Sequence, residues 1–380
     1  MIEVLTRNAV DVLPAGGLEQ KLKLGRPLRV KLGIDVTSPD IHVGRGIPLQ
    51  RMRSFQDAGH IGVLIVGDYT TRIGDPSGRS AERPILSDEE IDANAQTYME
   101  QAFQIIDRDS TEVRFNSEWL AGLTFADIIR LTRTMTVAQL LEREDFSKRL
   151  AAREPVSVSE LLYPLMQAYD SVAIAADVEL GGTDQLYNLL AGREVMQAYG
   201  LEPQIVLTTP LLLSWDGEKM SSSLGNNIPL TAPPEEQFGR TMRIPDSQLE
   251  EWHRLVLERE VPAGEPMDAK LALARAVVSR SHGEESATQA EAHFTRVVRE
   301  GQAPDQVPEI PLPEGDPVHL PALLASAFGL STSEARRLIG QGGLKVDGVT
   351  VTAMDISRAE LVDTTLQAGK RRFAKLRQTA

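Results

Sequence analysis

A strand–turn–helix segment near the N-terminus holds the side chains best suited to chemistry. The mostly apolar segment 28–34 predicts a strand, and a helix-like run begins shortly after Asp40. The first turn of a helix presents unpaired N–H groups and the positive end of its dipole. Gly44 lets a large anion approach that turn, and His42 and Arg45 flank it with donors. The pattern is typical of a phosphate site, although an ordinary strand–turn–helix corner would explain it equally well.

Two further stretches carry polar residues in a regular arrangement. Residues 217–226, Gly-Glu-Lys-Met-Ser-Ser-Ser-Leu-Gly-Asn, form a polar loop flanked by glycines. Tyr163, Gln167 and Asp170 are spaced four and three residues apart, so one helix face would present all of them. A surface helix with a polar face is the alternative interpretation. The segment Gly-Gly-Thr-Asp-Gln at 181–185 follows closely in the chain.

Together these stretches resemble the signatures of a known enzyme family. Asp-x-Thr…His-x-Gly at 35–44 and Lys-Met-Ser-x-Ser at 219–223 resemble the two signature sequences of class I aminoacyl-tRNA synthetases. Residues 163–170 and 181–185 resemble the amino-acid pocket of the tyrosyl-tRNA synthetases, of the bacterial type with a C-terminal S4 domain. The resemblance implies a ligase that makes tyrosyl-adenylate from tyrosine and ATP with Mg²⁺, and then transfers the tyrosyl group to the 3′ end of tRNA(Tyr). It implies no tightly bound cofactor and no protein-bound metal.

The resemblance also assigns roles to the matched residues. The lysine of the second signature is expected to meet the phosphates in the transition state. The implied catalytic residues are His42, Arg45, Lys219 and Ser222. The implied ATP-binding residues are Gly33, Asp35, Thr37, His42, Gly44, Gly182, Asp184, Lys219, Met220, Ser221 and Ser223. The implied tyrosine-binding residues are Lys31, Asp75, Tyr163, Gln167, Asp170 and Gln185.

Within the implied tyrosine pocket, three residues would hold the α-ammonium group and one would bind the phenol. Asp75, Tyr163 and Gln167 surround the ammonium, and Asp170 accepts the phenolic hydroxyl. For Asp75 alone, a turn carboxylate that caps its own backbone is the alternative. A pocket that hydrogen-bonds a phenol rejects phenylalanine, because its buried polar groups would then stay unpaired.

Three positions depart from the family pattern. Arg45 stands where the first signature has a second histidine, Ser222 replaces the second lysine of the other signature, and Val36 replaces a proline. Loss of one charge-assisted contact costs about 1.5–3 kcal/mol, which would slow activation without abolishing it. We expect Arg45 to supply the positive charge missing at Ser222. Two alternatives are a synthetase paralogue that acts as an RNA-binding or regulatory protein, and an enzyme that activates tryptophan.

The elements that position these residues alternate along the chain. Strands are predicted near 28–34, 62–67, 112–116, 177–180 and 204–208, and helices near 42–58, 88–107, 157–170 and 183–198. Such alternation favours a parallel sheet of doubly wound type, in which ligands lie beyond the carboxyl ends of the strands. The predicted fold class is therefore α/β, with a Rossmann-like doubly wound sheet, followed by an α-helical domain and a small α+β S4-like RNA-binding domain.

The predicted domain organisation follows the same pattern. Residues 1–27 are expected to form a leading helix and a polar connection, and several helical segments at about 118–156 are expected to form a dimer interface by resemblance. The domains are a catalytic domain at 1–228, a helical anticodon-arm domain at 229–302, a proline-rich linker at 303–317 and an S4-like domain at 318–380.

The C-terminal region differs in charge from the rest of the chain. The net charge is −14, but from Asp316 onward nine basic residues face six acidic ones. Two helices are expected at 319–328 and 331–340, the second capped by Ser331 or Ser333, before a basic final strand at 370–377. A small α+β cap with a solvated charged face is the alternative to RNA binding. The expected tRNA-binding residues are Arg336, Arg337, Lys345, Lys370, Arg371 and Arg372.

Composition excludes several other classes of protein. The 380 residues include no cysteine, so disulfides, thiolate metal sites and thiol nucleophiles are excluded. The six histidines show no metal-ligand spacing, and the N-terminus lacks the order of a signal peptide. We expect a cytoplasmic homodimer whose partners are L-tyrosine and tRNA(Tyr), with neither a membrane nor DNA as partner.

Overall fold

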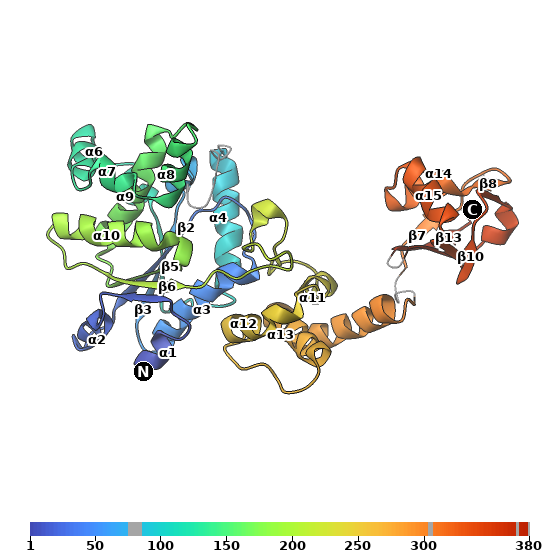
Figure 1. Cartoon of the computed structure of the whole chain (residues 1–380), viewed down its shortest axis with the longest axis horizontal. Coiled ribbons are helices and arrows are strands. Elements are labelled where there is room, and N and C mark those ends of the chain that lie inside the picture. The colour runs from blue at the N-terminus through green and yellow to red at the C-terminus, as the bar shows by residue number, and fades with distance from the viewer. Residues whose placement is uncertain (75–85, 303–306, 370–371, 379–380) are drawn as a thin grey trace. The chain divides into compact units, whose positions relative to one another are not determined.

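The structure is a computed structural model that describes residues 1–74, 86–302, 307–369 and 372–378. It divides into two compact units (Figure 1). Unit 1 comprises Met1–Pro233 and Arg240–Val277, and unit 2 comprises Pro234–Gly239 and Val278–Ala380. Each unit has its own buried hydrophobic clusters, and each is described by itself below.

Unit 1 is built on a six-stranded sheet with the order β1-β6-β5-β2-β3-β4. The strands are β1 (Asp11–Leu13), β2 (Arg29–Ile34), β3 (Ile61–Val66), β4 (Thr111–Phe115), β5 (Val178–Gly182) and β6 (Ile205–Thr209). The five strands from β2 to β6 are parallel, which confirms the predicted sheet. Strand β1 pairs antiparallel with β6, whereas a helix and a connection were predicted there. Three residues are too few to show a strand period, so this edge strand was missed.

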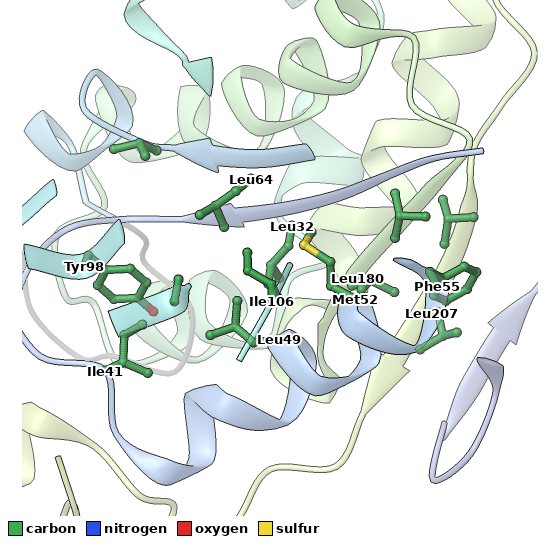
Figure 2. Close-up of a cluster of buried hydrophobic side chains, with 14 of the residues drawn as sticks. Leu32, Ile41, Leu49, Met52, Phe55, Leu64, Tyr98, Ile106, Leu180 and Leu207 are labelled. Carbon is green, nitrogen blue, oxygen red and sulfur yellow. The ribbon is translucent and has the colours of Figure 1, made fainter. Parts of the chain in front are cut away.

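Helices cross over between the parallel strands and supply the core of the unit. The main ones are α3 (Val43–Asp57), α4 (Asp88–Ala102), α9 (Val158–Ile174) and α10 (Leu186–Ala198). Figure 2 shows Leu32, Leu64 and Leu180 of the sheet packed near Met52 and Phe55 of α3. Burial of each such side chain contributes roughly 1.5–3 kcal/mol, so the sheet and its helices form a firm base for the loops at the strand ends.

Short helices fill the connections of unit 1. The predicted helical segments between β4 and α9 are present as α5 (Ser117–Leu120), α6 (Phe125–Thr132), α7 (Val137–Leu140) and α8 (Glu144–Ala151). The N-terminal helices are α1 (Ile2–Leu5) and α2 (Gly17–Leu22). The remaining helical turns and helices of the unit are η1 (Thr70–Arg72), η2 (Thr183–Gln185), η3 (Ser222–Leu224), η4 (Asp246–Gln248) and α12 (Leu249–Val256). Two helices are shared between the units, since most of α11 (Pro234–Thr241) belongs to unit 2 and α13 (Pro266–Phe294) continues into it.

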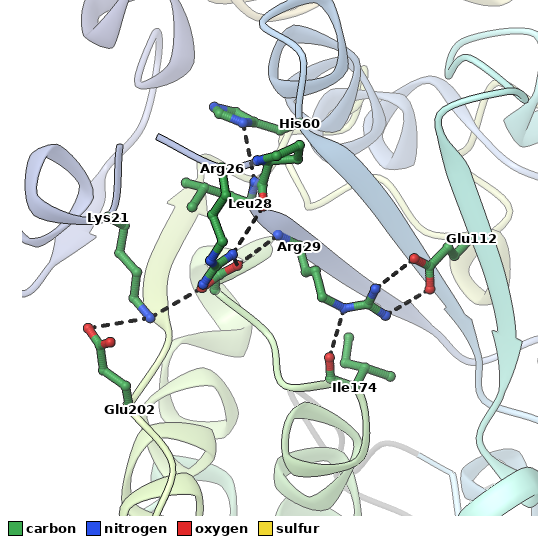
Figure 3. Close-up of polar contacts among 10 residues, drawn as sticks. Lys21, Arg26, Leu28, Arg29, His60, Glu112, Ile174 and Glu202 are labelled. Atoms are coloured by element: carbon green, nitrogen blue, oxygen red, sulfur yellow. Dashed lines mark hydrogen bonds and ion pairs between the residues drawn. The ribbon is translucent and has the colours of Figure 1, made fainter. Parts of the chain in front are cut away.

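An ion-pair cluster around the buried Asp177 joins the amino ends of the strands (Figure 3). Asp177, directly before β5, accepts a hydrogen bond of 2.7 Å from Arg26 and one of 2.9 Å from the backbone amide of Arg29. The Arg29 guanidinium in turn binds both carboxylate oxygens of Glu112 on β4, at 2.6 and 2.7 Å. The cluster therefore joins β2, β4 and β5 at the edge opposite to their carboxyl ends.

Unit 2 contains a five-stranded sheet with the order β10-β9-β12-β13-β7 and a two-stranded ladder. Its elements after α13 are η5 (Thr295–Arg299), β7 (Glu309–Pro311), β8 (Val318–His319), α14 (Leu320–Phe328), α15 (Thr332–Gly340), β9 (Leu344–Val346), β10 (Val349–Val351), β11 (Asp355–Ile356), η6 (Arg358–Leu361), β12 (Thr365–Ala368) and β13 (Arg372–Arg377). Ser331 caps α15, as predicted. Part of the predicted linker instead forms β7, an edge strand parallel to β13, where prolines are tolerated.

Across the ranges that the structure covers, none of the helices combines the length and the apolar character needed to cross a membrane.

Candidate functional site

A cavity of about 810 Å³ lies at the carboxyl ends of the parallel strands in unit 1. Residues of both signatures line it, together with residues of the proposed amino-acid pocket. The predicted site residues that line this cavity are Gly33, Asp35, Thr37, His42, Gly44, Arg45, Tyr163, Gln167, Asp170, Gly182, Asp184, Gln185, Lys219, Met220, Ser221, Ser222 and Ser223. Lys31 lies behind the wall, and Asp75 lies outside the described residues.

His42 is the N-cap of α3, and its ring is held by the helix that it caps. Its Nδ1 accepts a hydrogen bond of 3.3 Å from the Arg45 backbone amide, so the ring proton belongs on Nε2. Burial, and then the nearby charges of Arg45 and Lys219, lower the pKa of His42 to about 3. His42 is therefore a neutral N–H donor at the cavity. The cap is not Asp40, which ends the predicted turn and accepts a bond of 2.6 Å from Thr231.

Gly44 makes room for the His42 ring. A Cβ added at Gly44 would lie 3.2 Å from Nδ1 and 3.3 Å from Cε1 of that ring, and 3.5 Å from Cβ of Leu212. These distances are tighter than ordinary van der Waals contact with the ring. The sequence predicted that Gly44 admits the ligand, and the structure adds that it admits the neighbouring histidine.

Arg45 follows on the first turn of α3 and lies at the cavity wall beside Tyr98 of α4. Its guanidinium carbon is 5.9 Å from the centre of the Tyr98 ring. Its Nη1 atom is buried and has no hydrogen-bond partner among the residues that the structure describes. Ser222, at the position of the missing lysine, lines the same cavity and accepts a bond of 3.3 Å from Asn227. The structure thus brings two of the three departures from the signatures, Arg45 and Ser222, to one cavity.

The second signature is joined directly to the first. After the loop, the chain forms an antiparallel bridge between Pro229 and His42, with Val43 N–H donating to the Ile228 carbonyl at 3.0 Å. Met220 is buried in the same cluster as Val43 and anchors the loop in the unit. The Lys219 ammonium forms an ion pair of 2.8 Å with Asp184, at the end of β5.

Asp170 lines the cavity and is 3% exposed. Its Oδ1 accepts a hydrogen bond of 2.8 Å from the Trp119 indole, and its Oδ2 a longer one of 3.4 Å from Asn116. Burial raises the pKa of Asp170 to about 7, although the Lys31 charge and these two donors oppose the rise. The carboxylate is a ready acceptor for one further donor that enters the cavity.

The middle of the pocket is built around Asp35. Its carboxylate accepts a bond of 2.9 Å from the Tyr163 hydroxyl and one of 2.8 Å from Thr70. Asn116 donates in turn to Thr70 at 3.0 Å. A Cβ at Gly67 would come within 2.4 Å of both the Asp35 and Thr70 oxygens, so only glycine permits their approach. Asp35 belongs to the first signature and Tyr163 to the predicted tyrosine-binding residues, and the structure joins the two.

Lys31 is buried behind the cavity wall and bonds to residues of α9. It is 0% exposed, and its ammonium donates to the Gln167 carbonyl and the Ser171 hydroxyl, both at 2.8 Å. It also pairs at 2.8 Å with Glu179, which accepts a bond of 3.2 Å from the Gln167 side chain. These partners account for the three protons of the ammonium group, so Lys31 supports the helix segment that carries Gln167.

Sequence reasoning missed several residues of this site, namely Thr70, Tyr98, Asn116, Trp119 and Glu179. For Asn116 a signal existed, because it is the last residue of the strand predicted at 112–116 and directly follows the observed β4, at the carboxyl edge of the sheet. Trp119 and Glu179 contact their partners only through tertiary packing, and nothing in their local sequence indicates those contacts.

The basic residues of unit 2 lie on one small fold. Arg336 and Arg337 are exposed on α15, Lys345 on β9 and Arg372 on β13. Hydrogen bonds from Ser331 lower the pKa of Glu334, and the charges of Arg337 and Arg372 lower it further, which indicates that these two arginines lie near the same carboxylate. Lys370 and Arg371 fall outside the described residues.

The arrangement can align two reactants. One end of the cavity offers donors for phosphate oxygens, the neutral His42 Nε2–H and the cations Lys219 and Arg45. The other end offers a buried carboxylate, Asp170, for a hydroxyl donor. Because one cavity holds both ends, an acyl carboxylate can be positioned against a phosphate within it.

Comparison with known proteins agrees with this geometry. The family described as tRNA synthetases class I (W and Y) matches residues 23–299. The tyrosine–tRNA ligase of Moorella thermoacetica is 46% identical over 99% of this chain and 95% of its own length. That of Thermotoga maritima is 44% identical over 99% of this chain and 96% of its own length.

Solved structures share the fold at lower identity. The tyrosyl-tRNA synthetase of Archaeoglobus fulgidus in complex with L-tyrosine superposes with a TM-score of 0.63 and 23% identity, covering 76% of this chain and 98% of its own. That of Aeropyrum pernix gives a TM-score of 0.61 at 19% identity, covering 76% and 96%. The family model covers most of the chain, and the two ligases match it over nearly their whole length. The cavity is lined by both signatures. The chain therefore belongs to the tyrosyl-tRNA synthetase family of class I aminoacyl-tRNA synthetases.

Proposed function

We propose that the chain is a tyrosine–tRNA ligase, which activates tyrosine with ATP and transfers the tyrosyl group to the 3′ end of tRNA(Tyr). The observation that carries the proposal is the single cavity that both signatures and Asp170 line. In the first step a tyrosine carboxylate oxygen attacks the α-phosphorus of ATP. The bond from that phosphorus to the bridging oxygen breaks, and pyrophosphate leaves with the electron pair.

In this proposal the enzyme works by position and charge. The phenol of tyrosine donates to Asp170, which already holds the Trp119 indole at 2.8 Å. His42 donates from Nε2 to a phosphate oxygen and transfers no proton, because its pKa of about 3 keeps it neutral. Lys219 leaves Asp184 for the phosphates, where its charge stabilises the transition state. The contacts of His42 and Lys219 with the phosphates strengthen as charge develops on the leaving pyrophosphate.

Arg45 takes the place of the lysine missing at Ser222 in this mechanism. Support comes from their shared cavity and from the buried Arg45 Nη1, which lacks a partner in the described part of the chain. A ligand oxygen would satisfy that atom. Comparison of Arg45→His with the wild-type enzyme tests this assignment. A loss of roughly 10-fold or more in activation rate is expected, and an unchanged or higher rate would contradict it.

ATP enters as its Mg²⁺ complex in this proposal. Mg²⁺ keeps several waters and is usually held by substrate phosphates with one or two carboxylates. Asp35 and Asp184 are carboxylates of the described cavity, and Asp184 pairs with Lys219 at 2.8 Å. When Lys219 moves to the phosphates, Mg²⁺ bound to them would supply positive charge near Asp184 in its place.

A homodimer in the cytoplasm is the proposed working form. Large apolar side chains are exposed on the helices between β4 and α9 and at the start of α9, namely Phe125 (77%), Val137 (62%) and Val158 (75%). Contiguous exposed apolar patches mark interaction surfaces, and we propose that these three side chains belong to one such patch. A change of Phe125 to Glu should shift the mass measured by light scattering from dimer to monomer. A wild-type protein that is already monomeric at micromolar concentration would contradict the dimer.

The tRNA partner is assigned to the exposed basic residues of unit 2, Arg336, Arg337, Lys345 and Arg372. Their charges would contact phosphates, so charge-removing variants should weaken tRNA binding and reduce its salt dependence. Tyrosine-dependent ATP–pyrophosphate exchange should remain, because unit 1 holds the whole described cavity. Loss of exchange in such a variant would contradict this division of labour.

The test of the proposed function is ATP–pyrophosphate exchange with tyrosine, tryptophan and phenylalanine in parallel. Exchange with tyrosine alone, followed by charging of tRNA(Tyr), is the expected result. Exchange with tryptophan would contradict the Asp170 assignment. Absence of exchange from folded protein supplied with tRNA would favour a paralogue that binds RNA without activating an amino acid.

A further inference from the structure

Asn226 closes the loop that carries the second signature. The residue is 2% exposed, and its Oδ1 accepts a bond of 2.8 Å from the Ser221 backbone amide. Its Nδ2 donates to the Lys219 carbonyl at 3.2 Å and to the two Asp216 carboxylate oxygens at 3.1 and 3.0 Å. Its own carbonyl accepts from the Ser214 hydroxyl. One side chain thus joins the loop before, at and after Lys219.

Backbone contacts also hold this segment, because Lys219 forms an antiparallel bridge with Leu213 and the Met220 amide donates to the Leu212 carbonyl at 2.9 Å. No other side-chain amide among the described residues bonds to the backbone on both sides of Met220. Met220 packs in the core of the unit, but Leu224 is 61% exposed, and Asp216 is exposed as well. Gly217 and Gly225 have φ angles of 83° and 67°, so the backbone turns sharply on both sides of Lys219. Ordering each residue of such a loop costs backbone entropy, which the Asn226 bonds help to offset.

The charge at Asp216 is consistent with a preformed loop. Burial would raise the pKa of this carboxyl, but hydrogen bonds from the Asn226 amide and from the Glu218 backbone lower it. The carboxylate therefore stays ionised and accepts the hydrogen bonds from Asn226. Because Asn226 also binds the carbonyl of Lys219, the geometry sets where the lysine side chain begins.

We propose that Asn226 is a positioning residue for Lys219. It holds the backbone from Asp216 to Ser221 so that the ammonium of Lys219 reaches the phosphates in the transition state. The inference rests on the proposed function, in which Lys219 meets those phosphates. A misplacement of about 1 Å at such a group can cost on the order of 100-fold in rate.

Two variants of Asn226 and one neighbouring control test the proposal. Asn226→Ala removes all the side-chain bonds, and Asn226→Asp keeps the size but replaces the Nδ2 donor by an oxygen that repels Asp216. The control is Asn227→Ala, because Asn227 is similarly buried at 8% exposure and its side chain makes one long bond to Ser222. Both Asn226 variants should lower kcat of ATP–pyrophosphate exchange by roughly 10- to 100-fold, with KM for tyrosine unchanged. The control should stay within about 3-fold.

Trypsin gives a second readout that does not depend on activity. Lys219 is the tryptic site inside the loop, and its side chain is 39% exposed. In the proteins without ligand, cleavage after Lys219 should be at least about 10-fold faster in both Asn226 variants than in the wild type and the control. Peptide mapping identifies the cut, and equal melting temperatures exclude global unfolding as its cause.

The outcomes separate this inference from the proposed function. Asn226 variants with wild-type kcat and wild-type cleavage would overturn it. Faster cleavage with unchanged kcat would also overturn it, because Asn226 would then be only a structural support. A fall in kcat matched by an equal rise in KM for tyrosine would place the damage in the amino-acid pocket and would likewise contradict the inference. If the wild type itself shows no exchange, the proposed function fails, while trypsin still reports whether Asn226 holds the loop.

Discussion

Replacement of Asp170 by Asn should stabilise the ligand-free enzyme while it damages tyrosine recognition. Asp170 is 3% exposed, and its burial raises its pKa from 3.8 to about 7. Each pH unit of such a shift corresponds to 1.36 kcal/mol of differential interaction. A shift of about 3 units therefore means that the ionised carboxylate destabilises the folded state by up to about 4 kcal/mol.

The effect has a defined pH window. Below pH 4 the carboxyl is protonated in both the folded and the unfolded chain, and the destabilisation is absent. Between pH 4 and pH 7 only the unfolded chain ionises, so stability falls as pH rises. Above pH 7 both states are ionised and the full penalty of about 4 kcal/mol is present, against about 1.5 kcal/mol at pH 5. The stability gain of Asp170→Asn should thus be larger by roughly 2–3 kcal/mol at pH 8.5 than at pH 5.

Comparison between two pH values isolates this term. The amide would keep an acceptor for the Trp119 indole but could face the Asn116 amide with its own N–H₂ group. That change is the same at every pH, so it cancels in the difference. Urea unfolding followed by tryptophan fluorescence is the assay, because Trp119, Trp215 and Trp252 all lie in unit 1.

Asp177→Asn is the matched control with the opposite sign. Burial would raise the pKa of Asp177, but bonds from Arg26 and from the Arg29 amide, with the charge of Lys21, lower it below its usual value. The charged form therefore stabilises the fold above pH 4, and that stability is lost as pH falls below the folded pKa. Asp177→Asn should be destabilised by a constant amount from pH 5 to pH 8.5.

Two results would refute the reasoning about Asp170. One is a stability difference that is the same at pH 5 and pH 8.5, and the other is a loss of stability at pH 8.5 larger than at pH 5. Activity gives an independent check, since the phenol would meet an amide in place of a carboxylate. We expect kcat/KM for tyrosine to fall by roughly 5- to 150-fold, as for one unsatisfied buried group.

Three further predictions follow from the site. KM for tyrosine should rise as pH falls below about 7, because Asp170 becomes protonated there. The kcat at saturating tyrosine should show no step near pH 6.5, because the pKa of His42 is about 3. A kcat step near pH 6.5 would contradict the neutral histidine. Gly44→Ala should lower kcat of pyrophosphate exchange by about 10-fold at unchanged melting temperature, because its Cβ would lie 3.2 Å from the His42 ring and displace it. A wild-type kcat would show that the reaction tolerates the displaced ring. Lys31→Met should lower the free energy of unfolding in urea by about 3–5 kcal/mol, because Glu179 is left with an unpaired buried charge. Adding Glu179→Gln should restore most of that stability. Equal stability of the single and double variants would contradict this pairing.

The sequence by itself determined the order of the main parallel strands and most of the residues that line the cavity. Apolar alternation within single strands predicted β2 to β6, and the helix spacing of Tyr163, Gln167 and Asp170 placed all three on the cavity. These signals are local, because each depends on residues within one turn of helix or a few positions of strand. Short elements without a period were missed, which is why β1 and β7 were not predicted.

Only the tertiary structure decided which groups pair inside the site. Trp119 binds Asp170 across 51 positions of sequence, and Lys31 binds Ser171 across 140. Such contacts depend on the packing of distant elements, and neither residue type nor local spacing specifies the partner. For the same reason the burial that brings His42 to a pKa of about 3 and Asp170 to about 7 could not be read from the chain. Residue types set what each side chain can do, and the three-dimensional packing sets its charge state and its partner.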